Sequence, residues 1–256
     1  MNPLPSLPLI AESDANTVAY VLLVVGPLLA MAFFYFWKKA KRTRDLMAAT
    51  ETSPIGQLTE GPSEIRGRTD TSEKPLISPW RQQSCVHYCF HVEEQRSRTD
   101  SKGNTTRYWR TYIKDELTVP FLVKDETGQV VVDSSKIRFT LKEDRFSRSG
   151  LMNDADSGLQ QLLESRYNKK TKGWIFNKTL RYTETALEMD EEVYVFGEAS
   201  RLGGGWMLRH GKMPLIVSDE GGAAVEKSYS NRVIVFGVLG ILSVVTTCVG
   251  FVILVT

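Results

Sequence analysis

Two long runs without a charged residue constrain the fold of this chain more than any other feature. Val18–Trp37 contains 20 residues and Val233–Val255 contains 23, and neither run holds an Asp, Glu, Lys or Arg. A helix needs about 20 apolar residues to cross the ~30 Å hydrocarbon core of a bilayer. Neither run has polar residues at helical spacing, so a buried core helix explains them poorly. We therefore expect two transmembrane helices, at 18–37 and 233–255.

The charges beside these runs predict how the chain lies in the membrane. Glu12 and Asp14 precede the first run, whereas Lys227 and Arg232 precede the second. A basic cluster follows the first run: Lys38, Lys39, Lys41, Arg42 and Arg44. A cleaved signal peptide carries its positive charge before the apolar run, so this order predicts a retained helix. Because basic flanks stay on the cytoplasmic side, we expect both termini outside and residues 38–232 in the cytoplasm.

The rest of the chain divides by composition into segments. Residues 1–17 are expected to be a short exposed leader, and 38–53 a basic juxtamembrane linker. Residues 54–220 are expected to be one β-domain, and 221–232 a second linker. About 165 residues are enough to bury a core, so the segment 54–220 is treated as a single domain.

Short alternating or apolar runs between turn residues predict strands in this domain. The predicted strands are 84–93, 106–114, 121–123, 130–132, 137–141, 179–184 and 192–199. The turn at 124–128 predicts a hairpin with Gly128 in a left-handed conformation, and Gly203–Trp206 predicts a second, late turn. Leu159, Leu162 and Leu163 have helical spacing and predict one short helix over 157–165. The fold class we expect is therefore a mainly β soluble domain, a compact barrel or sandwich with an OB-like form among the candidates, flanked by two transmembrane helices.

The run CVHYCFH at 85–91 places cysteine and histidine at every second position. Alternate residues of a strand share a face and rise ~3.3 Å each, so Cys85, His87, Cys89 and His91 would spread over about 20 Å. One zinc ion with ligands at about 2.0–2.3 Å cannot use all four. We expect no metal here, and His87 with Cys89 is the only pair that we retain as a weak candidate. Val86, Tyr88, Phe90 and Val92 are expected to form the opposite, core face.

The sequence suggests no catalytic group and no cofactor. Cys85 and His87 would point in parallel from one strand, so the imidazole would not be aimed at the thiol as a base must be. No Gly-rich phosphate loop, serine nucleophile elbow or zinc-helix motif is present. Whether the protein is an enzyme stays open at this point, although the residues favour a binding role.

A basic stretch with aromatic residues lies at 166–181 and suggests contact with anionic lipid headgroups. Its candidate contact residues are Arg166, Lys169, Lys170, Lys172, Trp174 and Lys178. A solvated loop is the alternative. A domain tethered beside a membrane favours lipid over nucleic acid, so membrane lipids are expected as partners and nucleic acid is not. Small residues at Gly26, Ala30, Thr246 and Gly250 also permit association between helices, including those of two copies. A protein partner is expected, but its identity is unknown.

Several segments, in this order and spacing, resemble the membrane-flanked domain of the MULAN/GIDE family of E3 ubiquitin ligases. They are Gly56–Gly67, Ser78-Pro79, Cys85–Tyr88, Val92–Glu94, Trp109, Pro120–Gly128, Val130–Asp133, Arg181–Glu184 and Glu191–Glu198. The resemblance implies a GIDE-like domain over 54–220 and a place in ubiquitination. In that family the domain lies in an intermembrane space, whereas the charges here predict a cytoplasmic domain.

The resemblance also implies a RING in the ligases of that family, and such a RING holds two zinc ions, each four-coordinate. This sequence has three cysteines and three histidines, so we expect no RING within it. We accordingly expect a non-catalytic interaction, scaffold or sensor module. The alternatives are a ligase-family protein that takes its RING from a partner, and a module that binds anionic lipid.

Overall fold

Two long helices account for the two uncharged runs. Helix α1 spans Leu9–Ala49 and α3 spans Gly222–Val255 in the computed structural model, which describes residues 9–149, 156–170 and 178–255. Both contain a stretch long and apolar enough to cross a membrane, with mean hydropathies of 2.3 and 2.7. The expectation of two long apolar helices that flank a β-domain is confirmed. Residues 38–49 and 222–232 are helical too, so the segments expected as linkers largely continue the two helices.

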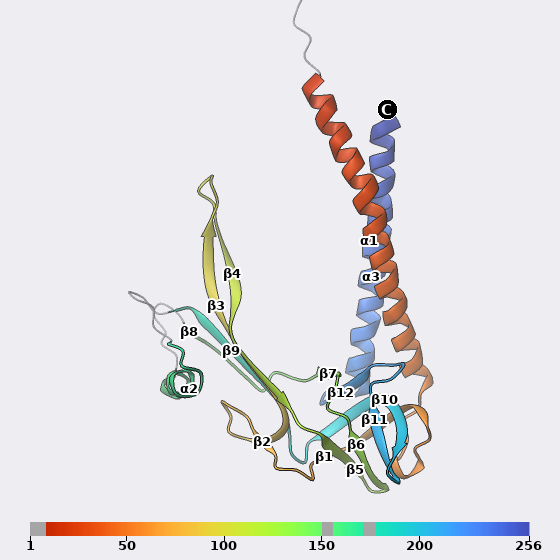
Figure 1. Ribbon diagram of the computed structural model, residues 1–256, viewed down its shortest axis with the longest axis vertical. Coiled ribbons are helices and arrows are strands. Elements are labelled where there is room, and N and C mark those ends of the chain that lie inside the picture. Colours follow the sequence, from red (N-terminus) through yellow and green to blue (C-terminus); the bar gives the residue numbers. More distant parts are fainter. Residues whose placement is uncertain (1–8, 150–155, 171–177, 256) are drawn as a thin grey trace, which may run out of the picture. The chain divides into compact units, whose positions relative to one another are not determined.

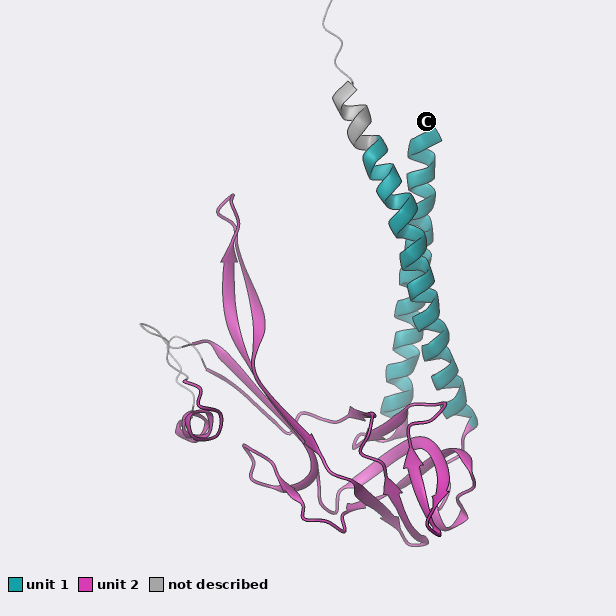
Figure 2. Cartoon of the chain, in the orientation of Figure 1, with its two compact units in different colours: residues 1–49, 223–256 teal, residues 50–222 magenta. Residues whose placement is uncertain are grey.

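Helices α1 and α3 pack on each other as one unit of the structure, drawn in teal in Figure 2. Gly250 lies against Leu22, where an added Cβ would approach the Leu22 Cβ to 2.8 Å. Gly26 similarly faces Thr247, and the rings of Phe36 and Phe236 stack with centroids 5.6 Å apart. Glycine at these positions therefore permits close approach of two helices of the same chain. Association between copies stays a prediction.

The second unit, residues 50–222, contains a closed barrel of five strands. The strands are β1 (Gly61–Asp70), β5 (Phe121–Asp125), β6 (Gly128–Val132), β10 (Glu192–Leu202) and β11 (Gly205–Arg209). The barrel closes because β10 pairs with both β1 and β11. Two further strands, β12 (Leu215–Ser218) and β7 (Ile137–Thr140), extend the sheet from β10. A short 3₁₀ helix at Ile55–Gln57 packs against β6.

Alternating apolar residues of these strands fill the barrel. The buried members of this core are Ile55, Leu58, Ile65, Val86, Phe121, Val123, Val130, Val132, Leu187, Val193, Val195, Ala199, Leu208, Leu215 and Val217. Most are β-branched or aromatic residues of the strands, which suit a pleated and half-buried surface. Val86 and Leu187 come from the second sheet, so the two sheets share this core.

The second sheet has the strand order β2-β3-β9-β8, and β4 pairs with β3 (Figure 1). Its strands are β2 (Leu76–Ile77), β3 (Ser84–Thr99), β4 (Thr105–Thr118), β8 (Arg145–Ser149) and β9 (Leu180–Glu188). Helix α2 (Ser157–Tyr167) packs through Leu159 and Leu163 on one face of this sheet, against Phe90, Val92 and Tyr182. The predicted fold class, a mainly β domain with a barrel and one short helix, is confirmed.

The turns differ in how they reverse the chain. Gly203 and Gly204 both have positive φ, 55° and 86°, between the paired residues Leu202 and Gly205, which is the backbone that a two-residue hairpin favours. The β5–β6 hairpin forms as predicted, but Gly128 is not among the described residues with positive φ. The Asp125 carboxylate instead accepts hydrogen bonds from the backbone N–H groups of Thr127 and Gly128 at 2.7 and 2.9 Å. The prediction of a left-handed Gly128 was therefore wrong, because an Asp side chain stabilises the turn.

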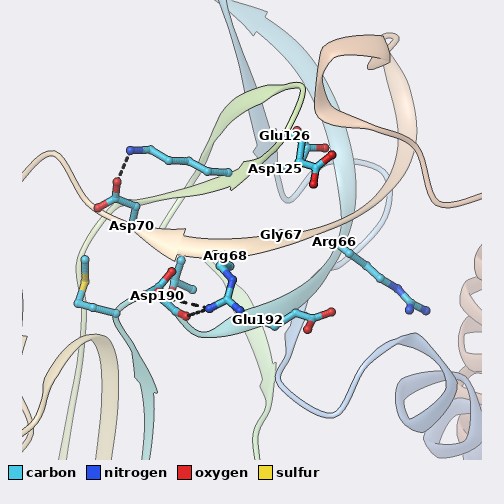
Figure 3. Close-up of a pocket in the computed structure, with 11 residues that line it drawn as sticks. Arg66, Gly67, Arg68, Asp70, Asp125, Glu126, Asp190 and Glu192 are labelled. Carbon is cyan, nitrogen blue, oxygen red and sulfur yellow. Dashed lines mark hydrogen bonds and ion pairs between the residues drawn. The ribbon is translucent and has the colours of Figure 1, made fainter.

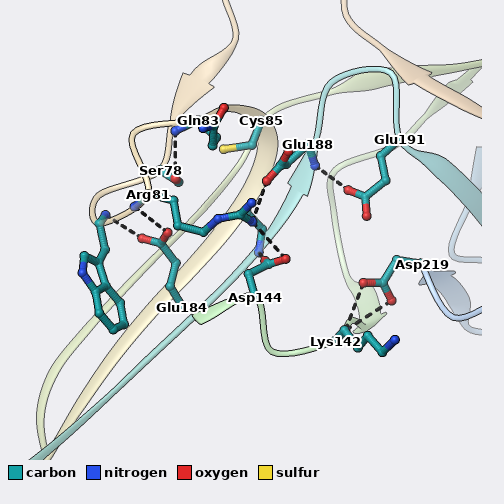
Figure 4. Close-up of polar contacts among 12 residues, drawn as sticks. Ser78, Arg81, Gln83, Cys85, Lys142, Asp144, Glu184, Glu188, Glu191 and Asp219 are labelled. Carbon is teal, nitrogen blue, oxygen red and sulfur yellow. Dashed lines mark hydrogen bonds and ion pairs between the residues drawn. The ribbon is translucent and has the colours of Figure 1, made fainter. Parts of the chain in front are cut away.

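A fully buried carboxylate fixes the loop before β3 (Figure 4). Glu184 accepts hydrogen bonds from the backbone N–H groups of Trp80 and Arg81, at 2.6 and 2.9 Å. The Arg81 guanidinium in turn lies 3.0 Å from Asp144. It also lies 2.5 Å from Glu188 Oε1, outside hydrogen-bond geometry, so that contact is an ion pair. These contacts connect the 78–83 loop, β9 and the segment that crosses from β7 to β8.

We predict that Glu184→Gln destabilises the β-domain. The amide would present N–H where a backbone N–H now donates, and a buried donor left without a partner costs about 1–3 kcal/mol. The midpoint of thermal unfolding of the full chain in detergent should fall by roughly 5–10 °C.

Glu126→Gln, at an exposed side chain of the β5–β6 turn, is the matched control. Equal midpoints for the two variants would contradict the role given to Glu184.

Candidate partner-binding groove

The CVHYCFH run lies in β3 at the centre of the second sheet, but its four Cys and His side chains do not share one face. Cys85 pairs with Glu188 and His87 pairs with Leu187, so Val86 is an extra residue that forms a β-bulge. The bulge moves Cys85 to the face of Tyr88 and Ala186 and directs Val86 into the barrel core. The predicted common face was wrong at Cys85, because a bulge reverses the alternation. Val86 is a core residue as predicted, but it lies in the barrel core and not on the face of Phe90 and Val92.

His87 is buried rather than open to a ligand. Its Nδ1 lies 2.8 Å from Thr118 Oγ1, and its ring stacks on Phe139 with centroids 3.7 Å apart. Burial lowers the pKa of His87 to about 4, although the nearby Glu116 acts in the opposite direction. The imidazole is therefore neutral at pH 7 and serves the packing between the two sheets.

The two thiols of the β-domain both have raised pKa values. Burial raises the pKa of Cys85 to about 12, and the charges of Glu184 and Glu188 add to this effect. Burial also raises the pKa of Cys89. Because the thiolate is the reactive form, neither side chain is poised as a nucleophile.

The face of the sheet opposite α2 contains a groove of about 430 Å³. It is lined by Cys89, His91, Glu93, Leu141, Glu143, Phe146, Arg181, Thr183 and Thr185. Three cross-strand pairs form its floor, because Cys89 lies opposite Thr185, His91 opposite Thr183 and Glu93 opposite Arg181. Leu141 and Glu143, from the segment before β8, complete the lining.

The polar groups of the groove are held in place by their neighbours. Glu93 accepts a hydrogen bond from Arg181 Nε, which is the main cause of the lowered pKa of that carboxyl. The Arg181 guanidinium also lies 4.6 Å from the centroid of the Trp109 ring. His91 Nε2 lies 3.2 Å from Thr111 Oγ1. The floor is thus a preformed surface whose charges are already paired.

Phe146 is the most exposed apolar group of this groove, with 58% of its surface accessible. It lies on β8, opposite Thr183 of β9. Strand β8 ends the strand order of the sheet, and among the described strands only β9 pairs with it. An extended peptide can add to such an edge by backbone hydrogen bonds while a side chain packs on Phe146.

The residues predicted to contact lipid lie near α2 and β9 and already make contacts within the domain. Arg166 donates to Asp115 at 3.1 Å and to the Tyr88 hydroxyl at 2.9 Å. Lys178 donates to the Tyr112 hydroxyl at 3.1 Å, and its Nζ lies 3.6 Å from Glu94. The Lys169 ammonium lies over the Tyr112 ring at 5.4 Å, and the backbone carbonyl of Lys170 accepts from the Tyr112 hydroxyl. Lys172 and Trp174 lie outside the described residues.

A second concavity, of about 700 Å³, lies beside β1 and the turn between β9 and β10 (Figure 3). Arg68 donates to the Asp190 carbonyl at 2.7 Å, and Lys124 pairs with Asp70. The lining of this concavity has no aromatic side chain, and its strand β1 pairs on both sides within the closed barrel, so it offers a weaker case for a protein partner than the groove. Within the ranges that the structure describes, no group of three or more His, Cys, Asp or Glu side chains is placed to hold a metal ion.

Sequence reasoning identified the strand that forms the groove floor but missed the groove itself. Residues 145–149 read Arg-Phe-Ser-Arg-Ser, which lacks the strict alternation of a half-buried strand, so β8 has little local indication in the sequence. The segment 144–149 pairs with β9, which is distant in the sequence, and no local pattern predicts such pairing.

Comparison with known proteins shows the family of this sequence. The family model GIDE, described as an E3 ubiquitin ligase, matches residues 91–254. The match runs from the middle of β3, through the groove strands, into α3. No curated protein and no solved structure matches the chain.

We predict that the buried His87 makes the stability of the domain depend on pH. Its pKa is lowered in the folded state, so the unfolded chain takes up more protons and stability falls as the pH drops from about 6.5 toward 4. The loss should reach roughly 3 kcal/mol at full effect. Thermal unfolding midpoints of the wild-type chain and of His87→Gln, taken at pH 7.5 and pH 4.5, measure the difference, which the variant should reduce.

His210→Gln, at an exposed side chain, is the control and should leave the pH dependence in place. An unchanged pH dependence in His87→Gln would contradict the assignment.

Proposed function

The chain belongs to the GIDE family, whose model is described as an E3 ubiquitin ligase, and on this premise we propose that it is a membrane-anchored binding module. In this proposal α1 and α3 hold the chain in the membrane, and the groove on the second sheet binds a protein partner for ubiquitin transfer. The chemical step belongs to another protein. The chain then acts as an adaptor or scaffold and forms no covalent intermediate itself.

The observation that carries the proposal is the exposed Phe146 at the edge strand β8, beside the ordered groove floor. An extended segment of a partner would pair its backbone with β8 and place one apolar side chain on Phe146. The threonine hydroxyls of Thr183 and Thr185 would offer further hydrogen bonds. Aromatic residues commonly contribute much of the affinity at such interfaces.

The state of the cysteines supports a binding role. A ligase that carries ubiquitin as a thioester needs a reactive thiolate. Cys85 is buried with a pKa of about 12, and Cys89 has a raised pKa on the groove floor. The alternative within the same family is a ligase complex in which a partner supplies the RING, and in that case this chain contributes the substrate or the membrane location.

We predict that Phe146→Asp reduces capture of the partner by about tenfold or more, because burial of a charge against an apolar side chain replaces a favourable contact. A photoreactive amino acid at Thr185, on the groove floor, would cross-link the bound protein in cells. The yield of the cross-linked species in the wild-type chain and in the variant is the measurement.

Leu202→Asp is the matched control, since Leu202 is 59% exposed on a different hairpin, and it should leave the yield unchanged. Equal cross-linking in both variants would remove the groove from the proposal. The non-catalytic part is tested separately with the purified chain, activating enzyme, conjugating enzyme and ubiquitin, where transfer by the chain alone would overturn it.

For orientation, we propose that residues 38–232 face the cytoplasm, because the basic residues lie on that side of both helices. Asn104-Thr105-Thr106 is an acceptor sequence for N-glycosylation at an exposed turn. We predict that Asn104 stays unmodified when the chain is inserted into endoplasmic reticulum microsomes. An acceptor sequence added ahead of Asn2 should instead be modified. A glycosidase-sensitive mass shift that depends on Asn104 would reverse the proposed orientation.

A further inference from the structure

The β3–β4 hairpin continues beyond the strands that support it (Figure 1). Strand β3 pairs with β9 only as far as Glu94, whereas its pairing with β4 continues to Thr99. Every residue from Arg96 to Tyr108 is exposed. The end of the hairpin is therefore a two-stranded ribbon with both faces in solvent, and an isolated ribbon of this kind gains little stability from packing.

The ribbon is strongly basic. The cations between Arg96 and Arg110 are Arg96, Arg98, Lys102, Arg107 and Arg110, the last opposite Glu94, and the single acidic residue in this stretch is Asp100. Arg96 pairs with Glu94 at 2.8 Å. The other four cations form no ion pair with an acidic residue that the structure describes. The hairpin thus presents four positive charges that the domain itself does not neutralise.

The tip that carries these charges has a defined geometry. The Asp100 carboxylate accepts hydrogen bonds from the backbone N–H groups of Lys102 and Asn104 at 2.9 and 2.8 Å. Gly103 supplies the positive φ of 83° that the turn requires. The hydroxyls of Thr99 and Thr105 lie 2.9 Å apart across the strands. The hydrogen bonds that Asp100 accepts favour its charged form, so the stretch from Arg96 to Arg110, with five cations and this one anion, carries a net charge of +4.

We propose that this hairpin binds the anionic phospholipid headgroups of the membrane in which the chain is anchored. Charge complementarity supports lipid, because four unpaired cations lie within a short ribbon. Chain connectivity supports the membrane as the source: residues 50–222 follow α1 directly and lead directly into α3. This double tether keeps the domain at a high effective concentration of headgroups. Tyr108, 45% exposed on the ribbon, is a residue type enriched at membrane interfaces.

Other surfaces and ligands fit the observations less well. Arg166 and Lys178 already pair with Asp115 and Glu94, so lipid would have to compete with these contacts. RNA and acidic peptides also bind basic ribbons, but neither is tethered to the chain as the membrane is. The inference goes beyond the proposed partner groove, and its test contains no partner protein, so the two proposals fail independently.

The test places an environment-sensitive fluorophore on the hairpin tip of the full chain in lipid nanodiscs. The label is attached at Ser101→Cys in a chain with Cys89→Ser and Cys248→Ser, while Cys85 is buried. The nanodiscs contain phosphatidylcholine, alone or with about one third phosphatidylserine, and a lipid with a quencher on its headgroup. Each basic residue near an anionic surface contributes about fivefold to binding, so four contribute several hundredfold. We expect strong quenching only with the anionic lipid, and its loss in about 1 M salt, where the Debye length is ~3 Å.

Two four-site variants with equal charge change locate the effect. Replacing Arg98, Lys102, Arg107 and Arg110 with glutamine should abolish quenching. Replacing four exposed residues outside the hairpin, Arg66, Lys74, Arg209 and Lys212, should preserve it. Two further measurements test the role of the hairpin cations without a risk to folding. One is the salt dependence of quenching in the unsubstituted hairpin, and the other is quenching in the single variant Lys102→Gln at the turn. Equal quenching in both lipids, or equal loss in both variants, would overturn the proposal. A label that responds to added RNA or acidic peptide but not to phosphatidylserine would overturn it in favour of that partner.

Discussion

The buried carboxylate of Glu184 sets the constraint on which the second sheet and its groove depend. A buried charge is costly in free energy unless hydrogen bonds and opposite charges compensate it. Here the N–H groups of Trp80 and Arg81 supply the hydrogen bonds. This places the Arg81 guanidinium where it also meets Asp144 and Glu188. One requirement of electrostatics thereby fixes a loop, a strand and the crossing segment between β7 and β8.

The groove follows from that arrangement. Asp144 accepts a hydrogen bond from the Ala186 backbone at 2.6 Å, which holds the crossing segment along β9. The residues on either side of Asp144 are then in place, so that Glu143 lines the groove and Phe146 stands at its edge. Phe139, in strand β7 just before the crossing, stacks on His87. His87 and Cys89 were the weak metal candidates of the sequence. Both lie beside this part of the chain, His87 against Phe139 and Cys89 in the groove with Glu143.

Sequence patterns predicted the two apolar helices, most of the strands and α2, since each depends on local periodicity. They failed where one residue or one distant contact decides. The bulge at Val86 reverses the faces of Cys85 and Val86, and the spacing of residues in the sequence does not predict it. In the β5–β6 turn, the Asp125 side chain stabilises the reversal of the chain, and Gly128 does not adopt the expected left-handed conformation. The hairpin was predicted as two strands that end at Glu93 and begin at Thr106, so its extended basic ribbon did not emerge from the sequence.

The distribution of charge explains how a chain with a small net charge presents a basic β3–β4 hairpin. The chain has 32 basic and 30 acidic residues, yet Glu184, Glu188 and Asp144 already contact Arg81 or backbone N–H groups. These carboxylates are therefore not available to the cations of the ribbon, and four of those cations have no acidic partner among the described residues. From Gln95 to Asp100 a strand rises about 17 Å, which exceeds the ~8 Å Debye length of physiological salt. The tip therefore acts as an independent positive surface, and the net charge of the chain does not describe what an anionic membrane would meet there.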